Sequence, residues 1–328
     1  MKPLASLSLD LDDQWSYMKT HGDAGWESFP SYLDLLVPRV LDFLAARGLR
    51  ITFFIVGQDA ALEKNRAALA AIAAAGHEVG NHSFHHLPWL HLYAEEEIER
   101  ELAQAEEAIA AATGQLPRGF RGPGFSLSAA TLAVLSRRGY RYDASTLPTF
   151  LGPLARLYYL MTARLSAEEK RRRKRLFGTF GEGLRPLAPY RWRLGERKLL
   201  EIPVTTMPVL RTPIHLSYLL YLGQYSPGVA RRYFQAALAL CRSGKIGPSI
   251  LLHPLDFLGG DDIDALRFFP AMRRPSGDKV RQVSDHLAQL GGSFRVVTMG
   301  EHAAALEGEA DLPERAARFR AAGAGAGA

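Results

Sequence analysis

The sequence predicts an α/β fold built on a mostly parallel sheet, either open or closed into a barrel. Strand-like runs alternate with helix-like segments through short connections, which is the pattern that parallel sheets require. The β-branched and aromatic run Ile51–Val56 stops at Gly57 and indicates a buried strand. Between Glu95 and Gly114, apolar residues recur at helical spacing and indicate an amphipathic helix.

The remaining predicted elements continue this alternation of strands and helices. The first is the apolar run Leu4–Leu11, which ends in a cluster of carboxylates. Glycines close several helical patterns, as expected of a residue that tolerates left-handed backbone at a helix end. The pattern predicts helices over Ala60–Ala75, Ala129–Arg138 and Pro227–Cys241, and strands over His77–Asn81, Leu200–Val204, Ser249–His253 and Arg295–Thr298.

The chain has 328 residues, a normal length for one α/β barrel. We therefore expect a single catalytic domain over 1–308. Residues 150–198 break the alternation and are expected to form an insertion. The end of the chain, 309–328, becomes rich in Ala, Arg and Gly, which predicts a disordered tail.

The net charge of +6 is concentrated in Lys170–Arg175, six consecutive basic residues, and without them 34 basic residues face 34 acidic ones (40 − 6 = 34). This balance argues against a nucleic-acid partner. An apolar helical face over Leu154–Leu165 precedes the basic run, and this combination predicts peripheral contact with an anionic membrane through 150–175. The alternative is a helix packed on the barrel with a solvated basic loop.

The single cysteine, Cys241, excludes an internal disulfide framework and fits a reducing compartment. No export signal is visible, because Asp10 interrupts the first apolar run. The sequence also has no stretch of 18 or more uncharged apolar residues. We therefore expect a cytoplasmic protein, with a peripheral position at the inner face of the membrane if the basic segment binds lipid.

Two short segments carry the strongest chemical signal. Asp10, Asp12 and Asp13 end the first strand, and His82 and His86 follow the third. On one helical turn, residues i and i+4 share a face, so two imidazoles can reach one ion. A carboxylate from a neighbouring strand end completes a two-histidine, one-carboxylate set that leaves positions open for water and substrate. The alternative is that the aspartates cap a helix and the histidines pair by chance.

At this point the sequence resembles the polysaccharide deacetylase family, also called the NodB homology or carbohydrate esterase 4 family. Segments similar to the family's five signatures occur in the family's order and span about three quarters of the chain. They are Ser8–Asp12, His82–His86, Arg121–Gly124, Asp143–Ser145 and Leu252–Pro254.

The resemblance implies a distorted (β/α)7 barrel that holds one divalent metal per chain, usually Zn²⁺. By position in the motifs, its ligands would be Asp12, His82 and His86. Asp13 adds a third carboxylate to the first motif, so the carboxylate ligand is either Asp12 or Asp13.

The resemblance also implies the acid and the base of an amide hydrolysis. Asp10 would be the general base, with Arg121 orienting it, and His253 the general acid, with Asp143 as its tuning partner. A metal polarises the poor electrophile of an amide and activates water, while an acid must protonate the leaving amine. Asp256, three residues after His253, is a further candidate for lining the site.

The predicted function is metal-dependent removal of an N-acetyl group from an amino sugar in a polysaccharide, glycoconjugate or lipid-linked glycan. One alternative is a deformylase or other amide hydrolase acting on a polyprenyl-linked sugar. Another is an inactive module that binds glycan or lipid. The apolar, tyrosine-rich stretch Leu216–Leu222 is expected to add a hydrophobic groove.

Overall fold

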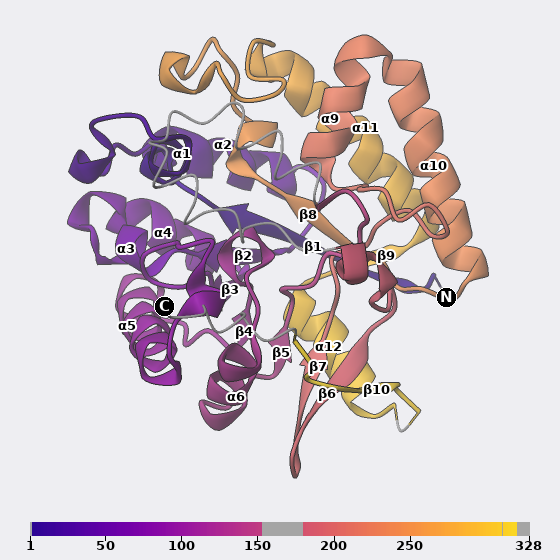
Figure 1. Cartoon of the computed structure of the whole chain (residues 1–328). Helices are drawn as coiled ribbons and strands as arrows, with labels where there is room; N and C mark the ends of the chain where they lie inside the picture. The colour runs from indigo at the N-terminus through magenta and orange to yellow at the C-terminus, as the bar shows by residue number, and fades with distance from the viewer. Residues whose placement is uncertain (1, 153–179, 310, 320–328) are drawn as a thin grey trace, which may run out of the picture.

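The structure is a computed structural model that describes residues 2–152, 180–309 and 311–319 (Figure 1). The predicted apolar face over Leu154–Leu165 and the basic run Lys170–Arg175 lie outside the described residues, so their membrane contact stays a prediction. Among the described residues, no helix has both the length and the apolar character needed to cross a membrane.

One mixed, mostly parallel sheet organises the molecule. Its strands follow the order β10-β6-β7-β5-β4-β3-β2-β1-β8, and β9 also pairs with β1. Only the β6–β7 pair is antiparallel among the described pairs of strands. The strands are β1 (Leu4–Leu11), β2 (Thr52–Ile55), β3 (Glu78–Asn81), β4 (Gly119–Phe120), β5 (Tyr142–Asp143), β6 (Tyr190–Leu194), β7 (Arg197–Glu201), β8 (Ser249–Leu252), β9 (Arg295–Val297) and β10 (Glu314–Ala316).

The sheet closes into a distorted barrel through an irregular extension of β7. The backbone N–H of Ile202 donates to Asp143 at 2.9 Å, and that of Thr205 donates to Ser249 at 2.9 Å, so this extension bridges β5 and β8. The parallel strands β1, β2, β3, β4, β5, β7 and β8 then form a ring. The predicted mixed α/β fold is confirmed, and its distortion has a visible cause in the two-residue strands β4 and β5.

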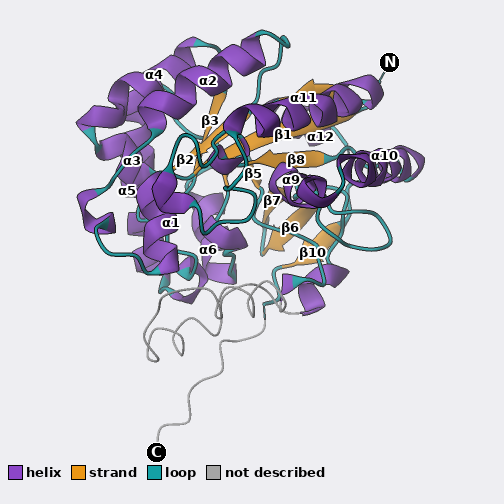
Figure 2. Cartoon of the chain, turned by 90° about the horizontal axis from the view of Figure 1, so that it is seen from above, coloured by secondary structure: helices purple, strands orange, loops and turns teal. Residues whose placement is uncertain are grey.

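Helices surround the strands, as Figure 2 shows from above. They bury apolar stripes against the outer face of the barrel, which forms the main core. The α-helices are α1 (Gln14–His21), α2 (Leu33–Ala45), α3 (Gly57–Ala61), α4 (Arg66–Ala74), α5 (Glu95–Thr113), α6 (Ala129–Arg137), α9 (Leu216–Tyr225), α10 (Pro227–Ser243), α11 (Ser276–Ser293) and α12 (Met299–Glu307).

Strand β1 lies at the centre of the site because its side chains alternate between two environments. Leu7, Leu9 and Leu11 belong to the main hydrophobic core. Ser8 and Asp10 point the other way, into the barrel, where both accept hydrogen bonds from the same guanidinium nitrogen of Arg121. This alternation aims Asp10 at the barrel interior.

Three predicted elements differ from the structure. The helix expected over Ala60–Ala75 is interrupted at Leu62, whose backbone is extended, so α3 and α4 are separate. The expected insertion contains β6, which forms a hairpin with β7. The expected disordered tail over 309–328 contains β10, which pairs with β6 through Glu314, Arg315 and Ala316. The tail prediction is therefore wrong for these residues, because a partner strand stabilises a segment of weak intrinsic β preference.

Candidate active site

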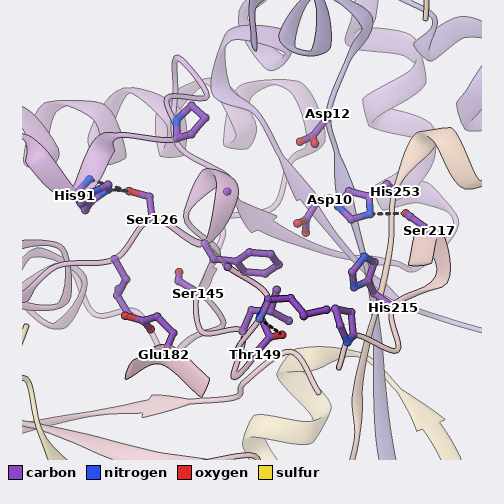
Figure 3. A pocket seen from close by; sticks show the side chains of 18 of the residues that line it. Asp10, Asp12, His91, Ser126, Ser145, Thr149, Glu182, His215, Ser217 and His253 are labelled. Carbon is purple, nitrogen blue, oxygen red and sulfur yellow. Dashed lines mark hydrogen bonds between the residues drawn. The ribbon is translucent and has the colours of Figure 1, made fainter. Parts of the chain in front are cut away.

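The candidate active site lies where the carboxyl ends of the parallel strands meet, the usual location in α/β barrels. Asp10 ends β1, His82 follows β3, Arg121 follows β4 and His253 follows β8. A cavity of about 2510 Å³ opens over these strand ends. Figure 3 shows Asp10, Asp12 and His253 on one wall of this cavity.

Asp12, His82 and His86 form a candidate metal centre, with ligand atoms that all lie within 4.8 Å of one another. The Oδ1 atom of Asp12 lies 3.0 Å from Nε2 of His86 and 3.4 Å from Nε2 of His82. Asp12 Oδ1 and His86 Nε2 are buried and have no hydrogen-bond partner. Buried polar atoms are normally paired, so these unpaired donors to a metal fit a divalent cation.

The charge and the tautomer of these ligands also fit a cation. Burial raises the pKa of Asp12, but the imidazoles of His86 and His82 outweigh this effect and hold the pKa far below its usual range. Asp12 is therefore a carboxylate. Nδ1 of His82 lies 2.6 Å from the carbonyl oxygen of Arg121, to which it donates, so Nε2 is the ring atom that faces Asp12 and can bind a metal.

The two histidines do not meet on a helical turn, so that part of the prediction is wrong. His82 and His86 belong to an irregular loop in which Ser83 and His86 have positive φ values of 62° and 50°. Glu101 of α5 holds this loop: its Oε2 atom accepts from the backbone N–H groups of Phe84 and His85, each at 3.1 Å. The Oε1 atom of Glu101 contacts the imidazole of His85. Glu101 is a supporting residue that no motif marked.

Asp13 is turned away from the histidines. Its Oδ1 atom accepts from the backbone N–H of Gln14 at 2.8 Å, which caps α1, and from that of Tyr32 at 3.0 Å. Burial raises the pKa of Asp13 to about 6, although hydrogen bonds from Ser31, Tyr32 and Gln14 lower it. Of the two adjacent carboxylates, Asp12 is the one that joins the two histidines.

Asp10 and Arg121 form a buried ion pair. Nη1 of Arg121 donates to Oδ1 of Asp10 at 2.6 Å and to the hydroxyl of Ser8 at 2.9 Å. Nε of Arg121 donates to the carbonyl oxygen of Ala144 at 3.0 Å, and the guanidinium carbon lies 4.4 Å from the ring centroid of Phe54. The fully buried guanidinium is thus held from several sides and fixes the orientation of Asp10.

Asp143 does not partner His253, contrary to the role implied by the family resemblance. Its Oδ1 atom accepts from the Ser145 hydroxyl at 2.5 Å, and its carboxyl neighbours that of Glu201 on β7. Burial raises the pKa of both carboxyls; the charge of Asp143 raises the pKa of Glu201 further, whereas a hydrogen bond from Glu201 lowers the pKa of Asp143. The oxygens of Glu201 accept from Thr146 and Trp192, and one proton shared between the two neighbouring carboxyls satisfies the pair.

His253 instead contacts residues near its own strand end. Its Nδ1 atom lies 3.0 Å from the hydroxyl of Ser217 on α9 (Figure 3). Ser217 donates to Oδ1 of Asp256 at 2.7 Å, and the backbone N–H of His253 donates to Oδ2 of Asp256 at 2.8 Å. The ring of His215 lies 6.0 Å from that of His253. Burial, with a smaller effect of His253, lowers the pKa of His215 to about 3, so His215 is neutral.

The rest of the cavity wall is largely apolar and aromatic. The stretch Leu216–Leu222, expected to add a hydrophobic groove, forms most of α9 and contributes several lining residues. The α9 residues that line the cavity include Tyr218, Leu220 and Tyr221. Further aromatic lining residues are Trp192 of β6, Phe268 and Phe269 before α11, and Phe319 after β10.

Two histidines and one carboxylate at the strand ends of a parallel α/β barrel are a ligand set typical of barrel proteins that bind a divalent metal. A family model described as polysaccharide deacetylase matches residues 23–142 of this chain. A chitin deacetylase from a Pestalotiopsis species is 30% identical over 111 residues, which are 34% of this chain and 37% of that protein. A peptidoglycan deacetylase from Helicobacter pylori is 32% identical over 149 residues, which are 43% of this chain and 49% of that protein. The chain thus spans less than half the length of these relatives.

The fold comparison covers nearly the whole chain. A solved structure from Mycobacterium smegmatis, assigned to the polysaccharide deacetylases without an established activity in its description, aligns with a TM-score of 0.64. It is 19% identical, and the alignment covers 97% of this chain and 95% of that one. At this identity the likeness shows the fold. The family model and the matched relatives confirm the resemblance to the polysaccharide deacetylase family that the five motif segments carried.

Proposed function

We propose that this protein is a metal-dependent hydrolase that removes an N-acetyl group from an amino sugar. The observation that carries the proposal is the buried Asp10–Arg121 pair beside the Asp12, His82 and His86 set, with His253 on the same cavity wall. The matched relatives are named for deacetylation of chitin and of peptidoglycan, which supports an amino-sugar substrate.

Each residue has a distinct task in this reaction. A divalent cation held by Asp12, His82 and His86 would polarise the amide carbonyl and make water a better nucleophile; Zn²⁺ suits this set of nitrogen and oxygen ligands. Asp10 accepts the proton of the attacking water, and the fixed guanidinium of Arg121 keeps its carboxylate aimed into the site. His253 donates a proton to the amine nitrogen as the bond to the acyl carbon breaks.

The size of the cavity bears on the substrate. At about 2510 Å³ it exceeds the roughly 300–1,000 Å³ of ordinary small-molecule sites. An extended glycan or a glycoconjugate therefore fits better than a free monosaccharide. The apolar and aromatic wall favours a second candidate, an amino sugar linked to a lipid, with either an acetyl or a formyl group removed. That substrate would agree with the predicted cytoplasmic position at a membrane.

The test combines metal analysis with product release. The purified chain should bind about one Zn²⁺ and release acetate or formate from a panel of polymeric, free and lipid-linked amino sugars. His82→Ala and His86→Ala should each lose the metal and the activity together, whereas Asp10→Asn should keep the metal and lose turnover. A metal-loaded chain that binds glycan and releases no acyl group would instead identify an inactive binding module.

A further inference from the structure

We infer that Ser217 and Asp256, and not Asp143, are the positioning residues of His253. They hold the proton of the His253 ring on Nδ1, so that Nε2 is the atom that serves the reaction. The contribution to turnover rests on the proposed function, whereas the position of the ring proton does not.

The hydrogen bonds form a directed chain. Both carboxyl oxygens of Asp256 accept: Oδ2 from the backbone N–H of His253 at 2.8 Å and Oδ1 from the hydroxyl of Ser217 at 2.7 Å. A serine hydroxyl has a single proton. Because that proton is directed to Asp256, the oxygen of Ser217 is left to accept, and its neighbour at 3.0 Å is Nδ1 of His253. The geometry therefore requires a proton on Nδ1.

The chain of bonds ends at the buried carboxyl of Asp256. Burial raises the pKa of Asp256 above its usual value, and the charge and backbone N–H of His253, the hydroxyl of Ser217 and the charge of Lys279 offset only part of this effect. Lys279 on α11 is 1% exposed, and its Nζ atom donates to the carbonyl oxygen of Leu258 at 2.7 Å. Asp256 thus accepts at both oxygens and has the buried ammonium group of Lys279 as a nearby cation, which suits a carboxylate at this position.

A fixed proton on Nδ1 has a direct chemical consequence. When the ring carries both protons, the Nε2 proton passes to the amine nitrogen as the bond between that nitrogen and the acyl carbon breaks. The Nδ1 proton stays on the ring throughout, and Ser217 and Asp256 exchange none. These two residues act through His253 by holding its ring and its tautomer, as the orienting carboxylate does in other acid–base sites.

The sequence motifs alone did not lead to this arrangement. Asp143 occupies the motif position of a tuning partner, yet among the described residues its hydrogen bond comes from Ser145, and its nearest ionisable neighbour is Glu201. Ser217 belongs to α9, a helix that follows the irregular closure of the barrel and packs on the segment after β8. The partner of His253 is therefore supplied by an element outside the parallel ring.

The ring proton can be observed without any substrate. We would record long-range ¹H–¹⁵N spectra of the full chain labelled at histidine, at a pH where the imidazole is neutral, and assign His253 by its loss in His253→Gln. The wild type and Ser217→Thr, which keeps the hydroxyl, should show the Nδ1–H tautomer. Ser217→Ala should shift His253 toward the Nε2–H tautomer. An unchanged Nδ1–H signal in a folded Ser217→Ala protein would overturn the inference.

Kinetics then separate this inference from the proposed function. Ser217→Ala should lower kcat by ~10–100-fold with KM changed less than about twofold, since general acids contribute ~10²–10⁴-fold. Ser217→Thr should restore most of kcat, and Asp143→Asn should leave the Nδ1–H tautomer of His253 unchanged. The chain could lack acyl-release activity while Ser217→Ala still changes the tautomer of His253. That result would contradict the proposed function and support the inference. Full turnover in Ser217→Ala would remove its role in the reaction.

Discussion

At the scale of single residues, adjacent side chains in this site have unrelated tasks. Asp12 joins two histidines, while Asp13 caps α1 and is turned away from them. The motif identified the pair of carboxylates and left the choice between them open. The extended backbone at the end of β1 identifies Asp12 as the ligand. Side chains alternate along such a backbone, so Asp10 and Asp12 point to the same side and Asp13 to the other.

Exchanging each of these aspartates for asparagine should separate their tasks. Asp12→Asn should lower Zn²⁺ affinity by more than ~10–100-fold, the loss that follows removal of outer partners of metal ligands. Asp13→Asn should keep the affinity, because asparagine caps helices about as well as aspartate. Isothermal titration with Zn²⁺ compares the two variants. Equal losses would show that Asp13 takes part in metal binding.

The Asp143–Glu201 pair predicts a pH dependence of stability. Burial raises the pKa of both carboxyls in the folded state, so the folded pair keeps a proton that the unfolded chain loses above the usual values of about 3.9 and 4.3. The folded state then binds more protons, and this pair's contribution to the free energy of unfolding falls as pH rises from about 4 until the shared proton leaves.

Asp143→Asn should remove much of this decrease in the free energy of unfolding with rising pH. The amide donates a hydrogen bond in place of the shared proton and does not titrate. Stability measured by urea unfolding at several values between about pH 5 and pH 8 should therefore rise in the variant, relative to the wild type, as pH increases. A difference between the two proteins that is constant across the series would show that the pair holds no extra proton.

At the scale of elements, the loop from His82 to His86 depends on α5, the α-helix that follows it in the sequence. Glu101 of α5 accepts from two backbone N–H groups of this loop and contacts His85. Sequence spacing predicted that His82 and His86 meet, but through a helical turn. The actual loop with its positive φ values could not be read from the motif, because its partners lie on another element.

Removing this support should weaken the metal site without removing a ligand. Glu101→Ala is expected to lower Zn²⁺ affinity by ~10-fold or more, since partners that orient ligands are worth ~10–100-fold. Glu99→Ala is the matched control: Glu99 lies on the same helix and pairs with Arg137 and Arg138. If both variants bind Zn²⁺ equally well, the loop does not depend on Glu101.

Long, strongly patterned elements were predictable, and short ones were not. The helix α5, with its buried stripe and a left-handed Gly114 at its end, matches its prediction closely. The two-residue strands β4 and β5 have no periodicity of their own, and β10 in an Arg- and Ala-rich stretch depends on its partner β6. Within the site, Ser217 is one polar residue in an apolar helix, and no local pattern links it to His253.

At the scale of the whole molecule, residues 311–319 are part of the fold. The backbone N–H of Arg191 donates to Pro313 at 2.8 Å, and the ring of Phe319 lies 5.8 Å from that of Trp192. A truncation after residue 309 should therefore lower stability by ~1–3 kcal/mol, in the range of lost core contacts. A truncation after residue 319 is the control and should leave thermal unfolding unchanged. Equal unfolding curves for the two truncations would show that β10 adds nothing to stability.

The two ends of the described chain have practical consequences for handling the protein. Pro3 accepts from the backbone N–H of Arg295 at the amino end of β1, the end opposite the strand termini that carry Asp10. Phe319 lies on the cavity wall, and residues 320–328 are the nine that follow it. An affinity tag or a surface linkage at the carboxyl terminus therefore begins within nine residues of the cavity. Attachment next to Pro3 lies at the end of β1 opposite that cavity.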